Sequence, residues 1–122
     1  MSNFVNIREA LQSLEIDPGT AGEPTRRRFI FDGAHLSANI ATGGQDGSAL
    51  HTQSAHDEVV VVIEGEAEFR VGDEIKVVST GDVMFIPKNT LHGRVRTISP
   101  TWAALSIYAP YFDRSKKNIE WA

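Results

Sequence analysis

Short runs of β-forming residues, separated by turn residues, fill most of the chain from residue 26 onward. The runs cover residues 28–31, 36–42, 58–64, 67–71, 75–79, 83–86, 93–98 and 102–109. Gly, Asp, Asn and Pro separate them, as in Asp32-Gly33 and Pro87-Lys88-Asn89. No long helical periodicity lies between the runs, which argues against a parallel α/β sheet. Eight short strands at this spacing predict an all-β antiparallel sandwich or closed barrel.

The first residues have the spacing of a short helix instead. Four apolar side chains recur at intervals of three to four residues and share one helical face: Phe4, Ile7, Leu11 and Leu14. Asn6 is a candidate N-cap with Glu9 three residues later, and residues 17–19 (Asp-Pro-Gly) predict the end of the helix. We expect a helix and arm over residues 1–25, a barrel over 26–110 and a surface tail over 111–122, with Phe112 and Trp121 as candidate anchors of the tail.

Residues 59–63 are apolar at five consecutive positions. A strand with one solvent-exposed face would alternate, so both faces of this strand are predicted to be covered. One face can point into the barrel, and the other needs a second sheet, the N-terminal helix or another subunit. Together with the small size of the chain, this pattern favours a homodimer.

Composition narrows the classes of protein that remain. A chain of 122 residues fits one domain, and its net charge of −4 does not favour nucleic acid or an anionic membrane as the main partner. The absence of cysteine excludes disulfides, thiolate metal sites and a cysteine nucleophile. No apolar run approaches the ~18–20 residues that span a bilayer, and residues 1–4 do not resemble a secretory signal. We therefore expect a soluble cytoplasmic protein.

Residues 51–58 contain a candidate metal-binding group. Because residues two apart in a strand point the same way, His51 and Gln53 share one face. A short bend then lets Glu58 return to that face at the start of the next strand. An imidazole, an amide oxygen and a carboxylate would converge there, and a second imidazole would complete a site. Nitrogen and oxygen ligands without sulfur suit Fe, Mn, Ni, Co or Zn.

A second stretch, residues 81–92, supplies that second imidazole. Gly81-Asp82 forms a predicted turn, residues 83–86 a short strand and residues 87–90 another turn, after which His92 opens the next strand. Residues 51–65 and 81–92 together resemble the two motifs of the cupin family. His51, Glu58 and Gly65 match the first motif, in which Gln53 takes the place of the second histidine. In the second motif Gly81, Pro87 and His92 match, while Asn89 replaces a glycine and Arg96 stands where an Asn is common.

The resemblance to small single-domain cupins implies a cupin-type antiparallel β-barrel, or jelly roll, and one divalent metal ion. The implied ligands are His51, Gln53, Glu58 and His92. A shorter spacing of the first motif would place Thr52 and Ser54 at the histidine positions, and His56 would then be a candidate ligand. Whether Gln53 or His56 completes the site stays open at this point.

The resemblance also implies a function: a metal-dependent enzyme acting on a small oxygenated organic acid, enol or sugar acid. Dioxygenase, isomerase and lyase chemistry all occur in the family, with oxygenase chemistry favoured here. His56 or Glu58 would move a proton. The alternative is a non-catalytic cupin that binds or senses a small ligand.

Four further residues are candidate substrate contacts. Arg94 and Arg96 have the strand parity of His92 and would clamp a substrate carboxylate, or else pair with Glu66 or Glu68. Trp102 and Tyr108 share a face of the last strand and either line the pocket or belong to the core.

Overall fold

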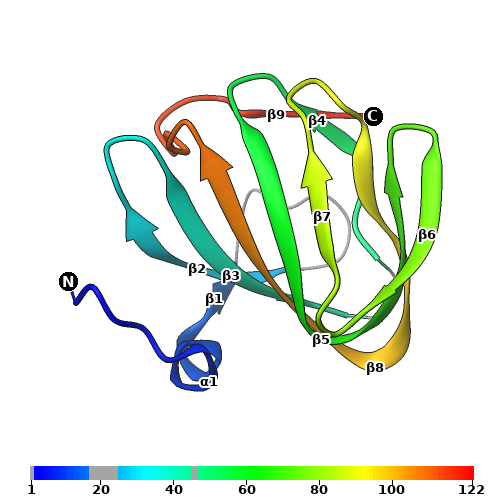
Figure 1. Cartoon of the computed structure of the whole chain (residues 1–122), viewed down its shortest axis with the longest axis horizontal. Helices are drawn as coiled ribbons and strands as arrows, with labels where there is room; N and C mark the ends of the chain where they lie inside the picture. The colour runs from blue at the N-terminus through cyan, green and yellow to red at the C-terminus, as the bar shows by residue number, and fades with distance from the viewer. Residues whose placement is uncertain (1, 17–24, 45–46) are drawn as a thin grey trace.

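The computed structural model describes residues 2–16, 25–44 and 47–122, almost all of whose secondary structure is antiparallel β-strand. The strands curl into a barrel-like jelly roll with one short helix outside it (Figure 1). The helical elements are α1 (Ile7–Ala10) and the 3₁₀ turn η1 (Leu11–Ser13). The strands are β1 (Glu15–Ile16), β2 (Arg26–Asp32), β3 (Ser37–Gly43), β4 (His51–Gln53), β5 (Asp57–Val71), β6 (Glu74–Ser79), β7 (Val83–Ile86), β8 (His92–Ala109) and β9 (Ile119–Trp121). The predicted all-β jelly roll with an N-terminal helix is confirmed.

Two long strands, β5 and β8, form the spine of the barrel. The sequence predicted each of them as two separate runs, but each is one bent strand, and the two pair from Asp57↔Ala109 to Val71↔His92. Three register shifts bend this pair without ending it, one of them beside Gly65. Gly65 has φ +102°, and a side chain there would meet the carbonyl of Thr101. The glycine therefore marks a bend within β5, where the sequence suggested a break between strands.

Burial along β5 separates an inner from an outer core. The inward-facing Val60 and Val62 belong to the core inside the barrel, while Val59 and Val61 face outward and are half-buried. The inner core comprises Val60, Val62, Ala67, Val78, Ile86, Trp102 and Ala104. The outer core, formed by Ala10, Ile30, Ala38 and Ile40, packs between the sheet and the helix. The apolar run at 59–63 predicted that its outward face is covered, and the N-terminal helix provides part of that cover through the cluster on which Ile63 packs.

The helix is shorter than its periodicity predicted. Asn6 does cap it, because its side-chain oxygen accepts a hydrogen bond from the Glu9 amide at 3.1 Å. Phe4 precedes the cap and is 87% exposed, so it does not share a helical face with Ile7 and Leu11 as predicted, and Ala10 is the buried residue of α1. The predicted stop at residues 17–19 lies outside the described residues. No helix in the described segments is both long enough and apolar enough to cross a bilayer.

Two short strands, β4 and β9, complete one end of the barrel. β4 pairs with β8 only at His51↔His92, but it pairs with β9 at all three of its residues. Figure 1 shows β9 (red) running beside β4 at the end of the barrel opposite α1. The tail, expected to lie on the surface, therefore contributes a strand to the sheet.

Candidate functional site

A cavity of about 690 Å³ opens among the inward-facing residues of the barrel and the C-terminal segment. Seven of the nine candidate metal-binding, catalytic and substrate-binding residues line it: His51, Gln53, Glu58, His92, Arg94, Trp102 and Tyr108. Two others, His56 and Arg96, do not line it. The fold therefore brings both motif regions to one site, although His51 and His92 are 41 positions apart in the sequence.

His51 and His92 face each other across the β4–β8 pair, with ring centroids 4.2 Å apart. Each ring places Nδ1 at 2.9 Å from a backbone carbonyl, that of Ala49 for His51 and that of Thr90 for His92. A carbonyl only accepts, so both Nδ1 atoms must donate, and both Nε2 atoms of the neutral rings carry a lone pair. Burial, reinforced by the neighbouring His92, lowers the pKa of His51, which favours this neutral form.

Glu58 begins β5 beside these rings and is only 6% exposed. Its Oε1 lies 3.4 Å from Nε2 of His92 and has no hydrogen-bond partner among the described residues. When the His92 ring is neutral, two atoms with lone pairs, Glu58 Oε1 and His92 Nε2, face each other in a buried site. A cation between these two atoms would stabilise the arrangement. Within residues 2–16, 25–44 and 47–122, no group of three or more His, Asp or Glu side chains is arranged so that it could hold a metal ion. The chemistry of the three side chains nevertheless fits a divalent ion.

Gln53 and His56 contact each other directly. Nε2 of His56 lies 2.7 Å from Oε1 of Gln53, and the His56 ring packs against Tyr108 and Phe112 at 4.8 and 4.9 Å between centroids. Burial lowers the pKa of His56, which is 1% exposed. His56 does not line the cavity, so it can act on a bound molecule only through its neighbours on the lining, of which Gln53 is the one it contacts by a hydrogen bond.

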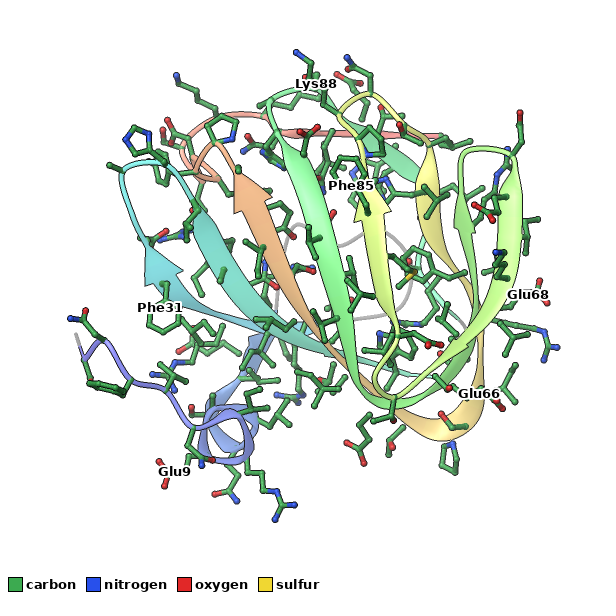
Figure 2. All side chains as sticks on the ribbon, viewed as in Figure 1. Glu9, Phe31, Glu66, Glu68, Phe85 and Lys88 are labelled. Atoms are coloured by element: carbon green, nitrogen blue, oxygen red, sulfur yellow. The ribbon has the colours of Figure 1, made fainter. Side chains whose placement is uncertain are left out.

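Arg94 and Arg96 lie on opposite sides of the sheet, although their spacing predicted a shared face. The pairs Phe69↔Arg94 and Glu68↔Arg96 place one extra residue of β8 between them, and this bulge reverses the alternation. Arg94 is buried, with its guanidinium 5.5 Å from the Trp102 ring. The side chain of Arg96 is 60% exposed and lies 3.7 Å from Glu68, which Figure 2 shows on the outside of the barrel. Arg96 thus adopts the ion pair foreseen as the alternative to a substrate clamp.

Sequence reasoning missed a chain of hydrogen-bonded polar side chains that runs across β2, β3 and β8. Arg27 on β2 lines the cavity and donates a hydrogen bond to Oδ1 of Asn39 at 3.0 Å. Nδ2 of Asn39 donates in turn to the hydroxyl oxygen of Tyr108 at 3.1 Å. Burial raises the pKa of Tyr108 to about 12, so its hydroxyl keeps its proton at neutral pH. The alternation of Arg27 and Phe29 along β2 is the signal that points to this chain, but a run of three arginines is more typical of a solvent-exposed strand.

The C-terminal segment forms another part of the wall. The Trp121 ring packs on His51 at 5.1 Å, and Phe112 packs on His56 and Tyr108. Arg114 holds this segment to β2 by hydrogen bonds of 3.0 and 2.9 Å to the two carboxylate oxygens of Asp32. The sequence identified the two aromatic anchors but not that they contact the site.

The described lining of the cavity is rich in cations although the whole chain is acidic. Five basic side chains line it: Arg27, Arg94, Arg114, Lys116 and Lys117. The acidic side chains on the described lining are Glu15 and Glu58. Three of these cations are paired with carboxylates that are not on the lining: Arg114 with Asp32, Lys116 with Asp113 and Lys117 with Glu120.

Comparisons with known proteins agree with this architecture. The structure of KdgF from Halomonas sp. superposes with a TM-score of 0.77 at 21% identity, over 95% of this chain and 100% of that one. An RmlC-like cupin from Shewanella frigidimarina gives 0.70 at 23%, over 90% and 92% of the two chains. The polyketide cyclase RemF from Streptomyces resistomycificus gives 0.73 at 19%, over 89% and 80%.

Sequence comparison gives the family directly. No curated protein matches the chain. The family model described as "Cupin domain" matches residues 37–104, more than half of the chain, and this span contains His51, Glu58 and His92. The chain belongs to the cupin family.

Proposed function

We propose that the protein is a metal-dependent enzyme that acts on a small oxygenated organic acid, enol or sugar acid. The single observation that carries the proposal is the buried Glu58 Oε1, which has no hydrogen-bond partner in the described chain and lies 3.4 Å from the Nε2 atom of His92. Removing a carboxylate oxygen from water without a partner is costly unless a cation compensates it. His51, Glu58 and His92 would hold that cation.

When bound, a divalent ion would supply Lewis-acid polarisation of a substrate oxygen. The chain's own residues would bind and orient the substrate around it. Arg94, buried beside Trp102, would bind a carboxylate through its guanidinium, since a planar fork of N–H donors matches a carboxylate. The hydroxyl of Tyr108 would donate to a second substrate oxygen, because its own oxygen already accepts from Asn39.

The size of the cavity fits this class of ligand. A cavity of about 690 Å³ falls in the range typical of small-molecule sites, and its described lining combines aromatic rings with cations. KdgF and RemF are proteins with the same fold, and RemF is named as a polyketide cyclase. Their fold supports a small-molecule role for the present chain, while the choice of an organic acid comes from the charge of the lining.

The metal content of the protein tests the proposal. Protein purified without chelator and then supplied with Fe, Mn, Ni, Co or Zn should retain about one ion per chain by elemental analysis. His92→Ala should retain less than about 0.1. His35→Ala is the matched control, because His35 is exposed and outside the cavity, and it should behave as the wild type. A metal-free wild type under metal-replete conditions would contradict the proposal.

A substrate panel separates catalysis from binding. The metal-loaded protein would be incubated with 2-hydroxy acids, 2-oxo acids, enols and sugar acids, and turnover followed by mass spectrometry. Thermal stabilisation by one of these compounds in the absence of metal, with no turnover, would instead identify a binding or sensing protein.

A further inference from the structure

The contact between Gln53 and His56 assigns Gln53 a role other than that of a metal ligand. We propose that His56 holds the side-chain oxygen of Gln53, so that the Gln53 amide nitrogen faces the cavity as a hydrogen-bond donor to the substrate. This inference rests on the proposed function for the substrate, but the state of the two side chains can be measured without it. Gln53 is then a substrate-binding residue and His56 is its positioning residue.

The tautomer of His56 decides which amide atom it holds. His56 Nε2 lies 2.7 Å from Gln53 Oε1, and Nδ1 is buried with no hydrogen-bond partner among the residues that the structure describes. With the proton on Nε2, His56 donates a hydrogen bond to Gln53 Oε1, and only the lone pair on Nδ1 lacks a partner. With the proton on Nδ1, a buried N–H would lack an acceptor, and orphaned buried N–H groups are rare in folded proteins. The Nε2–H form is therefore favoured, and it requires the amide oxygen of Gln53 at His56.

Packing holds this arrangement in place. His56 is 1% exposed and its ring contacts both Tyr108 and Phe112. Gln53 is 5% exposed and lines the cavity, whereas His56 does not. Gln53 therefore lies between His56 and the cavity. An amide nitrogen has no lone pair to offer a metal ion, so the group that Gln53 presents to the cavity is a donor.

The consequence concerns the substrate. His51, Glu58 and His92 form a set of two histidines and one carboxylate, which leaves more positions for substrate oxygens than a four-ligand set. A ligand suited to this site would carry a second oxygen acceptor beside the group that binds the ion. Acids with adjacent oxygen functions, such as 2-hydroxy and 2-oxo acids, have this property.

The first test needs neither metal nor substrate. The chain has only four histidines, so a long-range ¹H–¹⁵N spectrum of the metal-free protein resolves each imidazole. We expect His56 protonated on Nε2, and His51 and His92 protonated on Nδ1. A His56 protonated on Nδ1 would require the Gln53 nitrogen at His56 and would overturn the proposal.

The second test uses Zn(II) alone, measured by competition with a chromophoric chelator. Gln53→Leu should change the dissociation constant by less than about threefold, whereas His92→Ala should weaken it by about 100-fold. Gln53→His, which restores the second histidine, should tighten binding by about tenfold. Gln53→Met provides a second side chain without the amide if the leucine variant folds poorly, as checked by circular dichroism.

The outcomes separate the two proposals. A loss of about tenfold or more in Zn(II) affinity on removing the Gln53 amide in a folded variant would show that Gln53 is a ligand and refute the inference. A wild type that binds no Zn(II) or other divalent ion would refute the proposed function instead. In that case the His56 tautomer alone decides whether Gln53 is a donor.

Discussion

Trp121 should hold the histidine-bearing strand β4 in place, and Trp121→Ala tests this. Within the described chain, β9 pairs with β4 alone, and β4 pairs with β8 only at His51. Trp121 is 41% exposed, so it buries about 100 Å² of the 150–250 Å² typical of a tryptophan. At about 25 cal/mol per Å² this contact contributes about 2 kcal/mol after allowing for the alanine that remains. That energy corresponds to about a 30-fold increase in the opening of the β4–β9 pair.

Amide hydrogen exchange measures this opening residue by residue. In Trp121→Ala, protection at residues 51–53 should fall by about 30-fold, while protection at Val60 and Val62 in the middle of β5 should stay unchanged. Glu120→Ala is the matched control, since Glu120 is on the same strand, is exposed and contacts Lys117. Unchanged protection at residues 51–53, or an equal loss across the whole barrel, would refute the reasoning.

Three further predictions concern stability and assembly. Ile40 is fully buried in the outer core, so Ile40→Ala should lower the free energy of unfolding by about 3 kcal/mol in urea titrations, and Ile40→Val by about 1 kcal/mol. The hydrogen bonds from Arg114 lower the pKa of Asp32 in the folded protein below its unfolded value near 3.8. The pair therefore stabilises the fold fully at a pH above 3.8. This stabilisation is lost as the pH falls through the pKa of Asp32 in the folded protein. Asp32→Asn should therefore cost about 0.5 kcal/mol at pH 7, and the difference from wild type should disappear near pH 2; a constant difference would contradict this origin. Val83 and Phe85 on β7 are 63% and 59% exposed, and Figure 2 shows Phe85 on the outside of the barrel. We expect a homodimer through this face, which Phe85→Glu should convert to a monomer in light scattering; a monomeric wild type would refute it.

The fold was predictable because its signals are local. Turn residues such as Gly72-Asp73 mark the ends of strands, and the N-cap Asn6 marks the start of the helix. The bend at Gly65 was not predictable from the sequence. β5 and β8 stay paired through the bend, and no residue pattern distinguishes one bent strand from two separate strands. The short strands β1 and β9 carry too few residues for a periodicity and form only because a partner edge is available.

The candidate site was predictable to the extent that it depends on spacing. His51 and His92 lie together because β4 pairs with β8 in register at the two histidines, and Glu58 joins them because β5 begins at Asp57, a short bend after β4. The sequence could not decide between the two alternatives for Arg96, because the β-bulge that turns it out of the cavity toward Glu68 depends on how β5 and β8 align. The hydrogen bond between Gln53 and His56 was equally out of reach, since it depends on a bend between β4 and β5.

The parts of the site have different origins along the chain. The family match ends at residue 104 and begins at residue 37, and it contains the two histidines and the carboxylate. Arg27 precedes this span, and Phe112 and Trp121 follow it, yet all three either line the cavity or pack on its histidines. The shared domain therefore supplies the donor atoms, while segments outside it supply much of the wall that a substrate would meet. Arg27→Ala or Phe112→Leu should accordingly alter which small molecule binds while leaving the His51–Glu58–His92 donor set in place, because these two residues line the cavity outside the matched span.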